Sequence, residues 1–294
     1  MRMMEAMEAR VSTRSFDGAS LTAPEIEALT AILAGAAKEA TPFGNKVRLA
    51  LGAGEGEGKP LRLGTYGLIS GISAFIVPAV LSAPGALEDA GFIIEKAVLE
   101  ATAMGWASCW IGGVFSRSKA AAAAKLREGE IVPSVIALGR PAGRRSLADR
   151  IVAGAAKARS RKPLANLFFS AEGIGLDSGG LGEPWLAVAE ALRGAPSASN
   201  KQPWRLVRLP GGGGWLIFLE EDRVYNNSLG EVHIQNIDMG IGMRHFQEAA
   251  AELGMEGRWI PSPVAGVGLD EEKGIAKVLR LGEGRGWKPI ALWR

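Results

Sequence analysis

The sequence predicts a mixed fold of helices and strands, of class α+β with sandwich-like α/β layering, built from two related halves. Its 294 residues are enough for two domains of ordinary size. Helical stretches alternate with short apolar runs that are bounded by glycine or proline. Residues of the first half return in the second half at one constant offset, which indicates duplication. We place the halves at residues 1–170 and 171–294 and expect them to pack as one globular unit.

The first half contains two predicted helices and a buried strand. Residues 22–33 open with a capping-box pattern, Thr22 followed by Glu25, and carry a regular apolar stripe. Residues 87–104 form a longer apolar helix whose alanines and glycines suit close helix packing. Residues 134–138 form a short apolar strand that ends at a glycine.

The second half follows the same plan. Residues 185–192 are helical, and Gly194 ends this helix because glycine is the usual residue just past a helix. The apolar runs 206–209 and 215–219 flank a glycine run, which predicts a hairpin. Residues 170–183 are rich in glycine and lack periodicity, so we interpret them as the junction between the halves.

Matched residues at the same offset connect the two halves across helix, turn and strand. The pairs are Asp89 and Asp238, Gly91 and Gly240, Gly105 and Gly254, Trp110 and Trp259, and Ile111 and Ile260. Such a long period describes an internal duplication rather than a solenoid.

Composition excludes several classes of function. The net charge is only +3, and no basic patch interleaved with aromatic residues points to nucleic acid. One cysteine, Cys109, and two histidines, His233 and His245, are too few for a metal site or a histidine-based triad. We interpret Cys109 as a small core residue, and each histidine as a surface residue or a satisfied interior one. No apolar stretch is long enough to span a membrane, so we expect a soluble cytoplasmic protein.

Two polar stretches are candidates for ligand binding. Residues 195–204 include Pro196, Ser197, Ser199, Asn200 and Gln202. Their short hydrogen-bonding side chains suit a polyol or the edge of a heterocycle. Spacing alone favours an ordinary helix-to-strand turn, because all of these are turn residues.

The second polar stretch lies near the start of the chain. This stretch contains two guanidinium groups and a hydroxyl, from Arg10, Arg14 and Ser12. A guanidinium group can bind two phosphate oxygens at once. Taken alone, this stretch also fits a solvated basic turn.

These motifs together resemble the nitroreductase family of FMN-dependent oxidoreductases, and the whole chain resembles its double-length "TM nitroreductase" branch. The sequence Pro-Ser-x-x-Asn-x-Gln-Pro-Trp from Pro196 is similar to the family's flavin-binding loop. The stretch from Arg10 resembles the signature Arg-Arg-Ser-x-Arg-x-Phe that holds the FMN phosphate and ribityl chain, with Val11 in place of the second arginine.

Two further stretches carry the resemblance. Residues 105–113 look like the family's glycine-rich stretch beside the flavin ring, so Gly112 and Gly113 are implied as backbone contacts. Residues 159–164 resemble the basic segment that returns to the phosphate. This implies roles for Arg159 and Arg161, with weaker candidates at Arg144, Arg145 and Lys162.

The resemblance implies an oxidoreductase that passes hydride from NADH or NADPH through flavin N5 to a small-molecule acceptor such as a nitroaromatic or a quinone. Reduction and acceptor turnover would share one flavin face and give ping-pong kinetics. No side-chain acid or base is required, so we assign no catalytic residue. Two alternatives stay open: another FMN-dependent reductive task, and a flavin-binding protein without turnover.

Duplication suggests how many flavins one chain binds. In single-length relatives, one protomer supplies the phosphate cluster and its partner supplies the Pro-Ser-x-x-Asn loop. Here the first half keeps the arginine cluster, whereas residues 41–46 are a degraded copy of the loop. The second half keeps the loop, but no arginine lies between Arg161 and Arg193. We therefore expect one site per chain, in a monomer that is itself a pseudo-dimer, with further dimerisation left open.

This expectation predicts one FMN per chain. Asn200→Ala and Arg10→Ala should each abolish flavin binding, whereas Asn45→Ala should leave the flavin content unchanged. Flavin released per chain is measured together with the molar mass from light scattering. Two FMN per chain would contradict a single site, and one FMN shared by two chains would show that the site is intermolecular.

Overall fold

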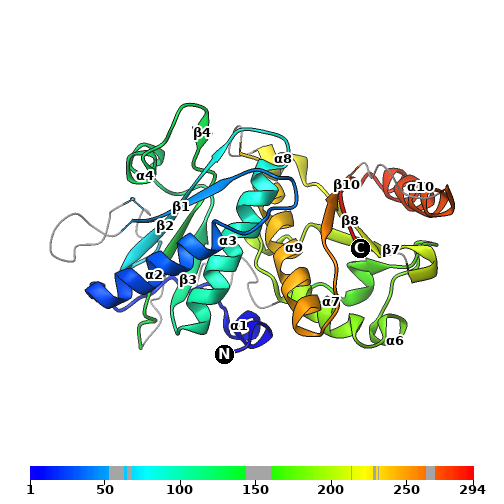
Figure 1. Ribbon diagram of the computed structural model, residues 1–294, viewed down its shortest axis with the longest axis horizontal. Helices are drawn as coiled ribbons and strands as arrows, with labels where there is room; N and C mark the ends of the chain where they lie inside the picture. Colours follow the sequence, from blue (N-terminus) through cyan, green and yellow to red (C-terminus); the bar gives the residue numbers. More distant parts are fainter. Residues whose placement is uncertain are drawn as a thin grey trace. The chain divides into compact units, whose positions relative to one another are not determined.

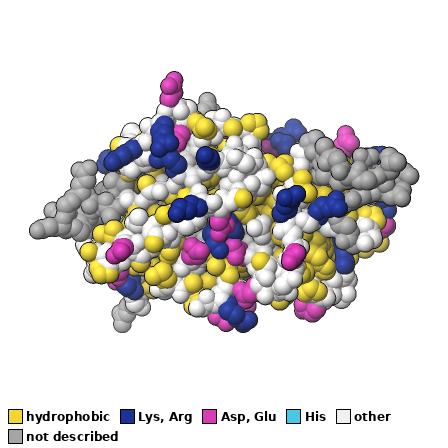
Figure 2. Space-filling model, viewed as in Figure 1, with side chains coloured by type: hydrophobic (Ala, Val, Ile, Leu, Met, Phe, Trp, Pro, Cys, Tyr) yellow, Lys and Arg dark blue, Asp and Glu magenta, His cyan; other side chains and the backbone are white. Residues whose placement is uncertain are grey.

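The structure is a computed structural model that describes most of the chain. The described residues are 1–52, 63–64, 68–143, 160–212, 214–227, 230, 232–262 and 269–294, with the side chains of 269–273 excepted. They form two compact units, Met1–Arg159 and Ser160–Arg294 (Figure 1). In this described part, no helix is both long enough and apolar enough to cross a bilayer. Basic and acidic side chains are interspersed on the face that Figure 2 shows.

The first unit is built on an antiparallel sheet. The sheet runs in the order β1 (Val47–Gly52), β2 (Ala74–Leu81), β5 (Val135–Gly139) and β3 (Ala107–Ile111), and the short β4 (Glu130–Ile131) also pairs with β2. The helices are α1 (Met3–Ala9), α2 (Ala23–Ala36), α3 (Ala86–Ala103) and α4 (Arg117–Ala124).

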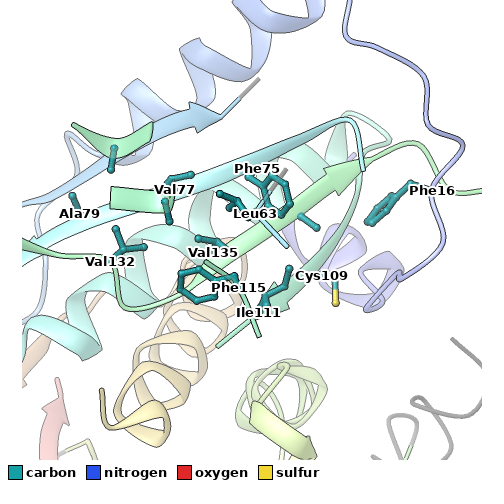
Figure 3. Packing of buried hydrophobic residues seen from close by; sticks show 13 residues of the cluster. Phe16, Leu63, Phe75, Val77, Ala79, Cys109, Ile111, Phe115, Val132 and Val135 are labelled. Carbon is teal, nitrogen blue, oxygen red and sulfur yellow. The ribbon is translucent and has the colours of Figure 1, made fainter. Parts of the chain in front are cut away.

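Side chains of this sheet alternate between two buried layers. Ala74 and Ile76 are as fully buried as their neighbours Phe75 and Val77, because both faces of β2 are covered. The layer that includes α4 is drawn in Figure 3, where Phe75 and Val77 lie with Val135 and Cys109. Cys109 is 3% exposed and belongs to this apolar cluster, which confirms its interpretation as a core residue.

The second unit contains a second five-stranded sheet. Its order is β6 (Phe168–Phe169), β7 (Trp204–Arg208), β8 (Trp215–Leu219), β10 (Lys288–Trp293) and β9 (Trp259–Pro261), with only the β6–β7 pair parallel. The helices are α6 (Ser178–Leu181), α7 (Trp185–Gly194), α8 (Arg223–Asn226), α9 (Ile234–Glu252) and α10 (Leu269–Gly284). Short 3-10 turns among its described residues are Leu164–Asn166, Ala198–Asn200 and Pro210–Gly212.

The two units share one order of elements. The path β1-β2-β5-β3 has the same connectivity as β7-β8-β10-β9. The helices α2 and α7 precede the first of these strands, and α3 and α9 follow the second. The α+β prediction is confirmed, and so are the predicted helices at 22–33 and 87–104 and the hairpin around the glycine run.

The division between the units differs from the predicted boundary at 170/171. It lies between Arg159 and Ser160, because Phe168 and Phe169 pair with β7 and thus belong to the second sheet. The glycine-rich stretch 170–183 is likewise part of the second unit. The backbone of Leu176 donates to the Phe168 carbonyl, and α6 packs against α7.

A buried aspartate on each long helix holds the loop that precedes the first strand of its unit. Asp89 on α3 accepts hydrogen bonds from the backbone N–H of Phe43 at 2.9 Å and of Asn45 at 2.8 Å, and from the Asn45 amide at 3.0 Å. Asp238 on α9 accepts one from Ala198 N–H at 2.9 Å. Its second oxygen, Oδ2, is buried without a hydrogen-bond partner in the described residues.

This difference shows in the acidity of the two carboxyls. Burial raises the pKa of Asp89, and its several hydrogen bonds oppose the rise. Burial raises the pKa of Asp238 to about 8, because one backbone hydrogen bond offsets little of the desolvation cost. The carboxyl of Asp238 is therefore mostly protonated at neutral pH.

Asp238→Asn should remove a pH dependence of folding stability. An unfolded aspartate titrates near 3.8, whereas Asp238 in the folded chain titrates at about 8. Between these values the folded state holds a proton that the unfolded state has lost, so the free energy of unfolding falls as pH rises. One proton contributes at most about 1.4 kcal/mol per pH unit.

Urea unfolding of the wild type and of Asp238→Asn at about pH 5, 6.5 and 8 measures this effect. The variant should gain stability relative to the wild type as pH rises. Asp89 is present in both proteins and cancels in the comparison. A stability difference that stays constant across the three pH values would contradict the prediction.

Candidate functional site

The loop between α7 and β7 is the most strained backbone in the described part of the chain. Three residues with side chains adopt left-handed φ angles: Ser199 at 47°, Asn200 at 55° and Gln202 at 48°. Outside this loop, Lys125 is the only other described residue apart from glycine with a positive φ. Each such residue costs about 1–3 kcal/mol and persists only where its surroundings impose the conformation, and such strain is concentrated at functional sites. The corresponding residues 41–46 place only a glycine, Gly44, at positive φ.

A side-chain hydrogen bond to another segment holds each of the three left-handed residues. The Ser199 hydroxyl lies 2.8 Å from the Tyr225 hydroxyl of α8. The Asn200 amide donates to the Ser160 carbonyl at 2.9 Å. The Gln202 carbonyl accepts from the backbone N–H of Lys162 at 2.9 Å. The surroundings of the loop therefore impose the strained turn.

The basic segment that the sequence singled out lies against this loop. One Arg161 nitrogen donates to the side-chain oxygen of Asn200 at 3.4 Å, and another donates to the backbone carbonyl of Gly194 at 3.1 Å. The Lys162 ammonium donates to the Gln202 backbone carbonyl at 3.3 Å. Burial and the neighbouring Arg205 lower the pKa of Lys162. Arg159, Arg144 and Arg145 lie outside the described residues.

The two ends of the loop are anchored in the core. Pro196 is buried and follows the end of α7. Gln202 is 3% exposed, and its backbone N–H donates to the Ser197 hydroxyl at 2.9 Å. Trp204 is fully buried beside Gly242 of α9, where an added Cβ would lie 3.1 Å from the indole. Gln202 and Trp204 therefore fix the turn from inside.

The middle of the loop is the part that a ligand can reach. Ser199 is exposed, and Ser197 and Asn200 are half-buried. These three side chains supply two hydroxyls and one carboxamide, which can donate and accept hydrogen bonds. Of the predicted loop residues, these are the ones the structure leaves accessible.

In the first unit, the predicted phosphate segment lies along β3. Ser12 forms a bridge to Ser108, and Thr13 N–H donates to the Ser108 carbonyl at 2.8 Å. Four residues farther along, about 13 Å on an extended strand, β3 leads into Gly112 and Gly113. Gly112 is half-buried and Gly113 is exposed. The structure thus places the segment and the glycines along the same strand.

Arg10 lies in the interior rather than on the surface. It is 7% exposed, and its Nε lies 3.9 Å from a carboxylate oxygen of Glu95 on α3. Glu95 also accepts a 2.8 Å hydrogen bond from the Trp110 indole. Burial lowers the pKa of Arg10, and the Glu95 carboxylate opposes this shift. The buried charge of Arg10 is compensated by Glu95, whereas Arg14 is only half-buried.

Sequence reasoning missed Tyr225, Ser160, Glu95 and the role of Asp238. One signal for Tyr225 was available: the connection from the second strand to the long helix spans residues 220–233 in the second half but only 82–85 in the first. The histidines match their interpretation: His233 is exposed, and His245 is interior with Nδ1 3.1 Å from the Ala191 carbonyl.

Of three similar solved structures, one covers nearly the whole chain and two cover about half of it. A crystal structure from Thermotoga maritima, described as a "putative nitroreductase", is 20% identical with a TM-score of 0.56, covering 90% of this chain and 91% of that chain. A Bacteroides fragilis nitroreductase with bound FMN is 19% identical, covers 50% and 92%, and has a TM-score of 0.39. An FMN- and NADPH-dependent nitroreductase from Sphigopyxis sp. strain HMH is 15% identical, covers 49% and 90%, and also has a TM-score of 0.39.

Among curated proteins, none matches this chain. The family model described as "Putative TM nitroreductase" matches residues 2–250, which is most of the sequence. The chain therefore belongs to this nitroreductase family.

Proposed function

We propose that this protein is an FMN-dependent oxidoreductase that uses NADH or NADPH to reduce a small acceptor such as a nitroaromatic or a quinone. Family membership supports the reaction class. The observation that carries the proposal is the braced, left-handed turn at Ser199, Asn200 and Gln202. Its strain occurs in the half whose loop resembles the flavin-binding motif and is absent from residues 41–46.

The chemistry of the second unit fits FMN. The flavin ring presents both hydrogen-bond donors and acceptors along its edge, the ribityl chain presents hydroxyls, and the phosphate is anionic. Ser197, Ser199 and Asn200 offer the matching neutral groups on the accessible part of the loop. Arg161 and Lys162 add positive charge next to that loop. The donor set therefore suits a polar, phosphorylated heterocycle.

Residues of the first unit supply the remaining proposed contacts. Ser12 and Arg14 would bind the ribityl and phosphate groups, and the backbone at Gly112 and Gly113 would approach the ring, because glycine permits close contact. We propose that Arg10 acts through its ion pair with Glu95, which fixes the start of this segment against α3. When bound, FMN would supply the redox chemistry, accepting hydride from the nicotinamide and reducing the acceptor.

Arg14→Ala should weaken FMN binding. Loss of a charge-assisted hydrogen bond to phosphate costs about 1.5–3 kcal/mol, or roughly 10- to 150-fold in the dissociation constant. The matched control is Arg127→Ala, which removes an exposed arginine of the same unit. Flavin fluorescence quenching measures the affinity. Unchanged affinity in both Arg10→Ala and Arg14→Ala would disprove the phosphate assignment, and tight binding of FAD but not FMN would disprove the cofactor.

Steady-state kinetics should give parallel lines in double-reciprocal plots. The reductant and the acceptor would use the flavin in turn, as in any ping-pong reaction. The assay follows NADH and NADPH oxidation against a panel of nitroaromatics and quinones. Intersecting lines would contradict a shared flavin face. Tight FMN binding with no nicotinamide oxidation would instead favour a flavin-binding protein without turnover.

A further inference from the structure

The second unit has an extra element beside its strained loop. In the first unit, residues 82–85 connect β2 directly to α3. In the second unit, the corresponding connection spans residues 220–233 and contains α8. The longer connection thus belongs to the unit that carries the left-handed turn.

Buried polar contacts fix α8 to the N-terminal end of α9 (Figure 1). Asn226 is fully buried, and its carbonyl accepts from the backbone N–H of Gln235 at 2.9 Å. The Gln235 carbonyl accepts from the backbone N–H of Asp222 at 2.9 Å. Asp222 in turn caps α8 by accepting from Tyr225 N–H at 3.1 Å. The backbone of Tyr225 therefore has a fixed position relative to α9.

The side chain of Tyr225 reaches the loop at two residues. Its hydroxyl lies 2.8 Å from the Ser199 hydroxyl. The Lys201 ammonium lies 5.2 Å from the centre of its ring, within the range of a cation–π contact. Lys201 also donates to Asp222 at 2.9 Å. The loop therefore contacts both the Tyr225 ring and the residue that caps α8.

Together, these contacts connect the loop, α8 and α9, and they restrict the conformation of Ser199. Ala198 N–H is held by Asp238 of α9, and the side chain of the next residue, Ser199, is held by Tyr225 of α8. Ser199, which has a left-handed φ, is thus held on one side by α9 and on the other by α8, and these two helices are hydrogen-bonded to each other. These attachments restrict both the backbone and the rotamer of Ser199.

A hydrogen bond donated by Tyr225 would also set the direction of the Ser199 hydroxyl proton. When the Tyr225 hydroxyl donates to the Ser199 oxygen in this hydrogen bond, the Ser199 hydroxyl proton is left to point toward a ligand. Burial raises the pKa of Tyr225, so the phenol keeps its proton across the physiological range. Because Ser199 is exposed, a ligand at the loop can reach this pair.

We propose that Tyr225 is a positioning residue that orients the Ser199 hydroxyl, so that Ser199 donates one hydrogen bond to an acceptor atom of the bound flavin. The proposal rests on the proposed function, because it names a determinant of the same flavin site. It assigns α8 the task of preparing the loop for its ligand before binding.

The test is a double-mutant cycle on FMN affinity in the full-length chain. Tyr225→Phe removes only the phenolic oxygen and leaves the ring that Lys201 covers. Tyr225→Phe and Ser199→Ala should each raise the FMN dissociation constant roughly 3- to 10-fold, as for one lost hydrogen bond. The double variant should be no weaker than the worse single variant, because both changes remove the same interaction.

The matched control is Val224→Ala, which alters a side chain on the same helix that is 87% exposed. It should leave FMN affinity unchanged. The visible absorption band of bound flavin should shift alike in Tyr225→Phe and Ser199→Ala, but not in the control. A purely structural role of Tyr225 would lower stability without this shared spectral change.

Two results would overturn the proposal alone while FMN binding by the wild type stands. One is an unchanged affinity in Tyr225→Phe when Ser199→Ala weakens binding. The other is a double variant whose loss equals the sum of the single losses. A wild-type chain that binds no FMN would overturn the proposed function and this inference together.

Discussion

The candidate site depends on holding a backbone conformation that its own residues disfavour. Three consecutive or near-consecutive side chains in the left-handed region would relax in an isolated peptide. In the second unit, the segment at Ser160, helix α8 and helix α9 each contribute a hydrogen bond that the relaxed loop would lose. The turn therefore exists only after these elements have assembled, and its polar groups are arranged before any ligand arrives.

The two related loops differ in how many hydrogen bonds they donate to the buried aspartate of their long helix. Asp89 accepts three hydrogen bonds from residues 43 and 45. The first loop therefore satisfies the buried carboxylate of its helix, and the Asn45 side chain is used for this purpose. Asp238 receives one, because Asn200 turns instead toward Ser160. A protonated, poorly satisfied carboxyl is the consequence in the second unit. Ser199 of the same loop is exposed.

Charge in the first unit is arranged by burial as much as by residue type. Arg10 and Arg14 are equivalent in a motif, yet Arg10 is nearly excluded from water and is neutralised by Glu95. An unpaired guanidinium at that depth would be costly, so the carboxylate stabilises the segment that carries both arginines. Glu95 also receives the Trp110 indole, which connects this ion pair to the strand that leads to Gly112 and Gly113.

The sequence by itself determined the local elements, the repeated order of the halves and the polar loop. Helix caps, apolar periodicity and turn residues act over a few residues, and they predicted α2, α3 and the hairpin. Only the tertiary structure decided what holds the loop. Tyr225 is 26 residues from Ser199, and both Asp238 and Ser160 are 40 residues from their loop partners. Residues 160–170 likewise belong to the second unit because of pairing with β7, and no local pattern encodes such contacts between distant segments.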